Sequence, residues 1–148
     1  MDVDRSAPAV ASGSIEIEAA PEVVWDLLTT VEAWPSWNPD IRTAELDGDL
    51  APGATFRWKA GPGTITSTIQ ELDPPHRITW KGRTFGIKAI HVHRLDPSTT
   101  GTRVVSEESW AGLPVRLLRG SLRKQLRKST DAGLQHLKRE AERRSAGP

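Results

Sequence analysis

Two histidines and a glutamate are the residues of this sequence best suited to chemistry. His91 and His93 lie two positions apart, and Glu108 follows in the next extended segment. Imidazole changes protonation near neutral pH, and a carboxylate can accept or return a proton, so the three could perform acid/base catalysis or orient a polar ligand group. They are also the donor types that bind a metal ion.

Strand alternation predicts that these side chains share one face. Residues 85–95 and 102–110 read as strands, and side chains two apart on a strand point the same way. His91 and His93 then lie with Leu95 on the inner face, opposite the more apolar face of the second strand, which leaves Arg103 and Glu107 outside. A hairpin that pairs Leu95 with Thr102 would place His91 across from Ser106 and diagonal to Glu108.

Three hypotheses for this group stay open. It could be a hydrogen-bonded network inside an apolar wall, because buried polar groups normally find partners. It could recognise a ligand or act as acid and base, with His91, His93 and Glu108 as the candidate catalytic residues. A metal site is the third hypothesis, but the sequence shows no residues that would orient the ligands, so we expect no metal and no cofactor.

The strands around this group are short and regularly punctuated. Ser14 to Glu18 alternates apolar with polar residues, and later Gly and Pro residues mark turns at close intervals. Strands are predicted near 40–46, 54–60, 64–72, 76–82, 85–95 and 102–110. With the first strand they make about seven, joined by hairpins in an antiparallel sheet.

Helical periodicity occurs twice. Pro21 to Thr30 predicts a short helix, followed by a second turn around 32–36. After Gly112 about thirty residues follow a helical period, and one apolar stripe contains Leu118, Leu122, Leu126, Ser129, Gly133 and Leu137. This stripe is expected to cover the concave face of the sheet, with Ser129 and Gly133 leaving room there. The predicted fold class is α+β.

Length and composition indicate one domain. The chain has 148 residues, 36% of them hydrophobic, no Cys, and no apolar run near the roughly 20 residues that span a bilayer. Residues 1–13 lack the apolar stretch of a secretory signal, so a cytoplasmic location is expected. We predict a flexible tail over 1–12, a ligand-binding domain over 13–143 and a frayed end over 144–148.

Positive charge is concentrated in the last helix. Residues 113–148 contain ten Lys or Arg against three Asp or Glu, although the whole chain carries only +1. A basic stripe follows Arg116, Arg119, Arg123 and Arg127. It could be a solvated face paired with the acidic sheet, or it could meet anionic lipid or an acidic partner. No nucleic-acid motif is present and the remainder is acidic, so nucleic acid is not an expected partner.

Four local patterns resemble one family. Ala20 to Leu28, Trp34 to Ile41, Leu72 to Trp80 and Gly101 to Val104 are similar, in this order, to segments of the START-like (SRPBCC) superfamily and its polyketide cyclase/dehydrase family. The resemblance covers residues 13–142. It implies a helix-grip fold, in which about seven strands wrap around the C-terminal helix and two short helices follow the first strand.

The resemblance also implies an internal cavity for an apolar or aromatic molecule. The segment with Trp34 and Trp37 covers the cavity mouth in this family, but no catalytic motif is common to its members. The expected ligand-binding residues are Trp37, Phe56, Trp58, Ile78, Trp80, His91, His93, Ser106, Glu108, Leu122 and Leu126.

Three functions follow as hypotheses. The chain carries or senses a hydrophobic small molecule such as a lipid, an aromatic or a polyketide-like compound. Alternatively it is a polyketide cyclase/aromatase or dehydratase that works in the same cavity, for example on a polyketone enol. As a third hypothesis, it is an adaptor whose basic helix docks on a membrane or an acidic partner without stable insertion into the bilayer. The sequence gives no indication of the oligomeric state.

Overall fold

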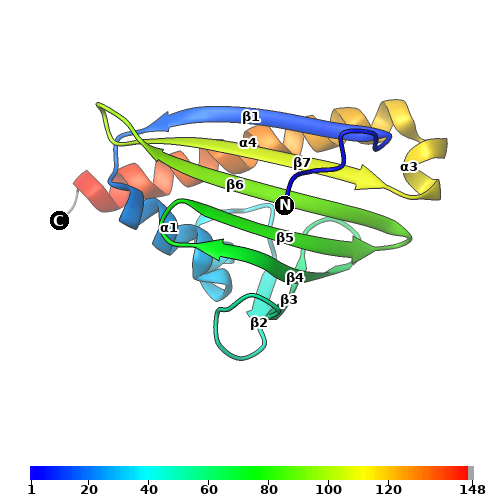
Figure 1. Ribbon diagram of the computed structural model, residues 1–148, viewed down its shortest axis with the longest axis horizontal. Coiled ribbons are helices and arrows are strands. Elements are labelled where there is room, and N and C mark those ends of the chain that lie inside the picture. The colour runs from blue at the N-terminus through cyan, green and yellow to red at the C-terminus, as the bar shows by residue number, and fades with distance from the viewer. Residues whose placement is uncertain (147–148) are drawn as a thin grey trace.

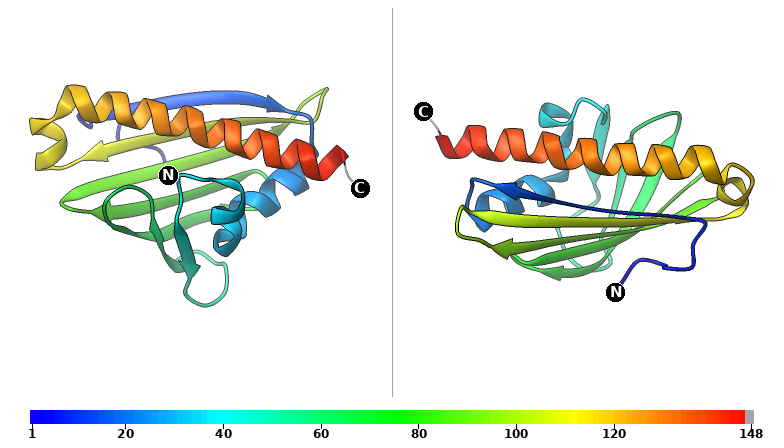
Figure 2. Two further views of the ribbon diagram at one scale, coloured as in Figure 1. Left: turned by 180° about the vertical axis from the view of Figure 1, so that it is seen from behind. Right: turned by 90° about the horizontal axis from the view of Figure 1, so that it is seen from above.

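A seven-stranded antiparallel sheet grips one long helix, as expected for a helix-grip α+β fold. The computed structural model describes residues 1–146. The long helix α4 (Arg119–Ala146) crosses one face of the curved sheet. The short helices that follow the first strand lie at the end of the sheet near the C-terminus (Figure 1, Figure 2). In the sheet, the first strand of the chain lies beside the seventh, and the order then runs through the sixth, fifth, fourth and third strands to the second.

Every predicted strand is present. The strands are β1 (Ala9–Ile17), β2 (Thr43–Leu46), β3 (Thr55–Lys59), β4 (Thr64–Asp73), β5 (Arg77–Thr84), β6 (Ile87–Pro97) and β7 (Thr102–Ala111). Successive strands from β2 to β7 pair as hairpins, and β1 pairs with β7 at the other edge. The Gly and Pro punctuation therefore marks the turns correctly.

The helices fall in the two predicted regions. They are α1 (Pro21–Thr29), the 3₁₀ turn η1 (Val31–Ala33), α2 (Trp34–Trp37), α3 (Leu113–Leu117) and α4 (Arg119–Ala146). Pro21 stands in the first turn of α1, where its missing N–H costs no hydrogen bond. Among residues 1–146, no helix is long and apolar enough to cross a membrane.

The ends of the chain differ from the predicted boundaries. β1 begins at Ala9 rather than Ser14, and the preceding residues lie on the outer face of the sheet, opposite α4 (Figure 2). There Val3 is buried, and Arg5 forms an ion pair of 2.7 Å with Glu107. Glu107 faces outward as predicted but is covered by this segment. At the other end α4 continues through Ala146, and the remainder of the predicted frayed end lies outside the described residues.

The buried stripe of the last helix differs from the predicted one. Leu118 is 57% exposed and interrupts the helix with φ −114° and ψ 33°, so α3 and α4 do not share one helical phase. Ser129 is also exposed. The buried side chains of α4 are Leu126, Thr130, Leu134, Leu137 and Ala141.

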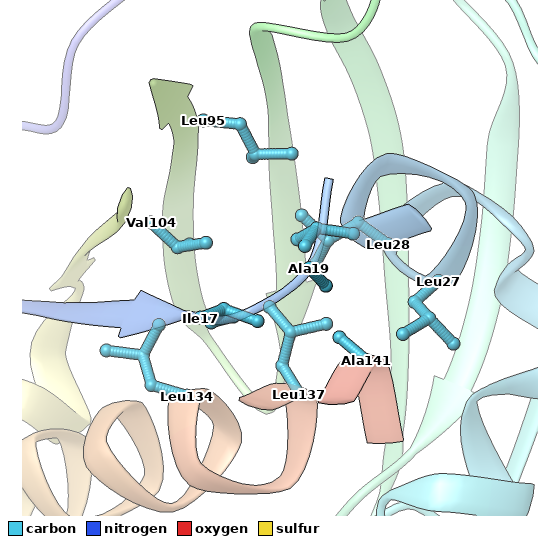
Figure 3. Close-up of a cluster of buried hydrophobic side chains, with 10 residues drawn as sticks. Ile17, Ala19, Leu27, Leu28, Leu95, Val104, Leu134, Leu137 and Ala141 are labelled. Carbon is cyan, nitrogen blue, oxygen red and sulfur yellow. The ribbon is translucent and has the colours of Figure 1, made fainter. Parts of the chain in front are cut away.

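Close contact with β1 fixes the position of α4. A Cβ atom placed on Gly13 would lie 3.0 Å from Leu134 Cδ1, which is tighter than ordinary contact, so the glycine lets the helix approach the strand. Farther along, Leu137 and Ala141 meet Leu27 of α1 and Ile17 of β1 in a buried cluster (Figure 3). The C-terminal half of α4 is therefore part of the core.

Leu137→Ala tests this role of α4. Leu137 is 2% exposed, so we expect the free energy of unfolding to fall by about 2–5 kcal/mol, through lost burial and the cavity left behind. The matched control is Leu118→Ala, for which we expect a change of about 0.5 kcal/mol or less. Urea denaturation followed by tryptophan fluorescence measures both. Equal effects at the two positions would contradict the packing of α4 described above.

Candidate functional site

A cavity of about 490 Å³ lies between the inner face of the sheet and α4. Its lining comes from β3 to β7, from the segment 34–41 and from the middle of α4. Several lining residues are also exposed to solvent and so mark the opening: Gly61, Pro62, Arg83, Phe85, Gln125 and Ser129. The cavity therefore opens between the β3–β4 and β5–β6 loops and the N-terminal half of α4.

Tryptophan side chains make the apolar wall. Trp34 of α2 packs edge-on against Trp58 of β3 at 5.6 Å between ring centroids. It also packs against Trp80 of β5 at 5.7 Å, with the ring planes tilted by 38°. Trp34 Nε1 donates to the Leu28 carbonyl, and Trp58 Nε1 donates to Ser67 Oγ at 3.1 Å. The N–H groups of these two indoles are thus satisfied, which leaves their ring surfaces for the wall.

Most of the predicted ligand-binding residues line this cavity. Those in the lining are Trp37, Trp58, Trp80, His91, His93, Ser106, Glu108 and Leu122. Phe56 and Ile78 lie outside the lining and are fully buried in the cluster around Trp34. Leu126 also lies outside it, buried against Val115 and β1.

The β6–β7 register differs from the predicted register by two residues. Leu95 pairs with Val104 instead of Thr102, which puts Glu108 directly opposite His91 and Ser106 directly opposite His93. A shift of two residues leaves every side chain on its predicted face. The inner-face assignment of the histidines is therefore correct, and only their partners change.

The polar side chains form two adjacent pairs. His91 Nε2 lies 3.1 Å from Glu108 Oε1, and Trp110 Nε1 donates to Glu108 Oε2 at 2.7 Å. His93 Nδ1 lies 2.6 Å from Ser106 Oγ. The two imidazole rings stack at 4.8 Å, and both contact Trp80. An ordered polar strip thus runs along one wall of an otherwise apolar cavity.

Burial disfavours charge on all three titratable groups. Desolvation lowers the pKa of His91 to about 3 and the pKa of His93 well below its ordinary 6.5. Desolvation also raises the pKa of Glu108 to about 7, although the hydrogen bond from Trp110 acts in the opposite direction. At neutral pH the imidazoles are uncharged, and the Glu108 carboxyl is near the midpoint of its titration.

Three lining side chains each keep a polar atom unpaired. Among residues 1–146, Trp37 Nε1, His91 Nδ1 and Thr130 Oγ1 are buried and have no hydrogen-bond partner. An unpaired buried donor or acceptor costs roughly 1–3 kcal/mol.

Sequence reasoning missed the loops and part of the helix that complete the cavity. The missed lining residues include Asn38, Asp40 and Ile41 after α2, Gly61 to Gly63, Phe85, and Thr130 and Leu134 of α4. Asn38, Asp40 and Ile41 belong to the segment that the resemblance places at the cavity mouth, although none of them is among the expected ligand-binding residues. Residues 61–63 and Phe85 carry only turn signals in the sequence, so nothing there points to a cavity. Ser129 and Gly133, expected to leave room, do line it.

A further contact joins the segment after α2 to α4. His136 Nε2 of α4 lies 3.4 Å from Asp40 Oδ2. Within the described part of the chain, no group of three His, Asp or Glu side chains is arranged to hold a metal ion. The His91, His93 and Glu108 side chains are instead engaged with one another and with their neighbours.

Comparison with known families agrees with this architecture. The family model described as polyketide cyclase / dehydrase and lipid transport matches residues 8–142. The chain belongs to this family. No curated protein matches its sequence.

Solved structures share the fold of this chain at low sequence identity. A hypothetical protein from Helicobacter pylori superposes with a TM-score of 0.83 at 14% identity, covering 94% of this chain and 91% of the other. A START superfamily protein from Mycobacterium smegmatis gives 0.76 at 16% identity, covering 90% and 97%. The di-domain ARO/CYC StfQ from the steffimycin biosynthetic pathway gives 0.79 at 16% identity, covering 95% of this chain but 53% of that protein.

Glu108→Gln tests the perturbed carboxyl of this family member. Because the pKa rises from 4.5 to about 7 on folding, the folded state holds more protons than the unfolded chain between these values. The free energy of unfolding should therefore fall as pH rises through this window, by roughly 3 kcal/mol from this group. Glutamine cannot titrate, so the variant should gain this amount relative to the native chain between about pH 5 and about pH 8.

Because His91 and His93 also make stability depend on pH, the effect of Glu108 is measured as the difference in stability between Glu108→Gln and the native chain at each pH. The depressed pKa values of these histidines give stability that increases with pH below about 6.5, but this contribution is common to both proteins and cancels. Urea denaturation at several pH values provides the data. Glu45→Gln, at an exposed position of β2, is the control for removal of one carboxylate. A stability difference between Glu108→Gln and the native chain that does not vary with pH would contradict the raised pKa.

Proposed function

We propose that the chain binds a hydrophobic small molecule in this cavity, as a carrier or a sensor. The observation that carries the proposal is the cavity itself, which has about 490 Å³ and an apolar wall that includes the indole rings of Trp34, Trp58 and Trp80. Small-molecule sites commonly measure about 300–1,000 Å³ and combine apolar walls with a few polar groups. A lipid, an aromatic or a polyketide-like compound fits this description, and the family description names lipid transport.

The polar strip would orient the ligand. His91, His93 and Glu108 lie on one side, and the tryptophan wall lies around Trp34 and Trp58. A ligand with one oxygenated end could place that end against the strip while its body contacts the indoles. Uncharged imidazoles suit this role, because they offer hydrogen bonds without the cost of desolvating a charge.

Gly133→Leu tests whether the ligand binds in the cavity beside α4. A Cβ atom on Gly133 meets nothing within 4 Å, and the residue lines the cavity, so a leucine side chain would extend into it. We expect ligand affinity to fall by about tenfold or more, because the ligand then clashes or binds in part. Tryptophan fluorescence titrations with fatty acids, flavonoids and polyketide aromatics measure the affinity.

Gly120→Leu is the matched control. Gly120 is also in α4, its Cβ position is equally open, and it does not line the cavity. Both variants gain about 1 kcal/mol of helix propensity, so their stabilities stay comparable. A panel in which no compound changes the emission or the melting temperature of the native chain would count against the binding function.

A second candidate is a polyketide cyclase/aromatase or dehydratase. The observation that favours it is the Glu108 carboxyl, whose pKa is raised to about 7 inside the cavity wall. A base of this strength can take a proton from the carbon between two carbonyls, leaving an enolate. The enolate carbon then bonds to another carbonyl carbon of the same chain, and the resulting alkoxide recovers the proton from Glu108. This aldol cyclisation balances without a cofactor.

Substitution of Glu108 separates the two candidates. If Glu108 is the base, Glu108→Gln should lower turnover of a poly-β-ketone by about 100-fold or more, while binding of the aromatic product persists. His91→Phe should produce a smaller loss of turnover, through misplacement of the carboxyl. Product formation by chromatography and binding by fluorescence are the two measurements. Equal losses in both would favour a binding role for the strip over catalysis.

A further inference from the structure

Large apolar side chains are exposed at the cavity opening. Leu113 and Leu117 of α3 are 67% and 74% exposed, Leu118 is 57% exposed, and Phe85 in the β5–β6 turn is 68% exposed. Single exposed apolar residues are common, but several at one end of a chain are typical of an interaction surface. We call Phe85, Leu113, Leu117 and Leu118 the mouth patch.

The two parts of the mouth patch are neighbours in space. The β5–β6 turn touches the chain just before α3, since a Cβ on Gly112 would lie 2.2 Å from the Gly86 carbonyl oxygen. Pro114 also lies near Gly86. Figure 1 shows the β5–β6 turn and α3 at the same end of the molecule, far from the C-terminus. Phe85 itself lines the cavity, so the patch borders the opening.

The backbone at Phe85 is unfavourable for a bulky residue. Phe85 has φ 45° and Gly86 has φ 75°, so both central residues of this two-residue hairpin lie in the left-handed region. Such turns favour Asn-Gly or Asp-Gly, and a bulky side chain there is an outlier. Its ring also occupies space above Gly63, where a Cβ atom would lie 2.3 Å from the ring. The strained turn thus presents an aromatic ring beside the opening.

Exposed positive charges lie on α3 and the N-terminal half of α4, next to the mouth patch along the chain. Residues 113–130 contain no Asp or Glu, and six exposed cations lie there: Arg116, Arg119, Arg123, Lys124, Arg127 and Lys128. Within residues 1–146, none of the six forms an ion pair with a carboxylate, although Arg123 donates to the Pro8 carbonyl. Pairing with the acidic sheet, one expectation from the sequence, therefore does not account for this stripe. Its charges are available to an anionic partner.

We infer that the mouth patch and this basic stripe dock the protein on an anionic lipid bilayer. Exposed leucine and phenylalanine side chains enter the interfacial region, and the cations lie at the level of the phosphates. Docking in this way turns the cavity opening toward the bilayer. A hydrophobic ligand could then pass between the bilayer and the cavity, and this one step rests on the proposed function.

Vesicle sedimentation tests the docking. Vesicles of phosphatidylcholine mixed with phosphatidylglycerol should bind the native chain, and vesicles of phosphatidylcholine alone should bind it much more weakly. Removal of two cations in Arg116→Ser/Arg119→Ser should weaken binding by about 25-fold, at about fivefold per charge. Leu117→Ser/Leu118→Ser should weaken it by about tenfold or more, through lost apolar burial.

Matched variants control for net charge. Lys81→Ser/Arg103→Ser removes two exposed cations from the outer face of the sheet and should leave vesicle binding within about twofold of the native value. Equal losses in the two charge variants would overturn the assignment to the mouth patch. Absence of binding to anionic vesicles, together with self-association that Leu117→Ser/Leu118→Ser abolishes, would make the patch an interface between copies of the chain and overturn the proposal.

Ligand affinity in solution separates this inference from the proposed function. The substituted leucines and arginines do not line the cavity, so their variants should bind fatty acids or aromatics as the native chain does, while losing vesicle binding. Gly133→Leu should show the reverse. If the native chain binds fatty acids or aromatics but does not bind anionic vesicles, the docking is overturned and the cavity function stands. If it binds anionic vesicles but none of these ligands, the cavity function is overturned and the docking stands.

Discussion

The cavity exists because one helix covers only part of a seven-stranded sheet. Contact between α4 and β1, tight enough to require Gly13 opposite Leu134, holds the helix over one edge of the inner face. The remainder of that face needs another cover. The segment 34–41 supplies it with Trp34 and Trp37, which close over Trp58 and Trp80 without filling the space. The depth of the site thus depends on the position of the helix.

This incomplete cover sets the electrostatics of the site. Residues on the inner faces of β6 and β7 are far enough from solvent to lose most hydration, yet they border a space that no protein atom fills. Desolvation then keeps His91 and His93 neutral and raises the pKa of Glu108. The strip stays ordered because Glu108 contacts His91 across the strands and accepts from Trp110 within β7, while His93 contacts Ser106 across the strands.

Sequence patterns determine which face a residue occupies better than they determine its partner. Period-two alternation correctly placed His91, His93 and Glu108 inside, because any shift by two residues preserves the faces. The pairing of β6 with β7 depends on the conformation of the turn between Pro97 and Thr102. The Gly and Pro residues there mark the position of the turn but do not determine the register of the two strands. The helical stripe failed differently. It assumed one continuous helix, but the break at Leu118 changes the phase and leaves that leucine exposed.

The failure at Leu118 carries functional information. A leucine at a position that helical periodicity assigns to the core, but that the structure leaves in solvent, has no stabilising role in the folded chain. The exposed cations around it likewise find no carboxylate among the described residues. Both observations concern the opening of the cavity and not its depth. The polar strip inside the cavity is adapted to uncharged polar contacts, whereas the rim combines apolar side chains with positive charge. A ligand that enters the cavity therefore loses its hydration at the rim, before it reaches the strip.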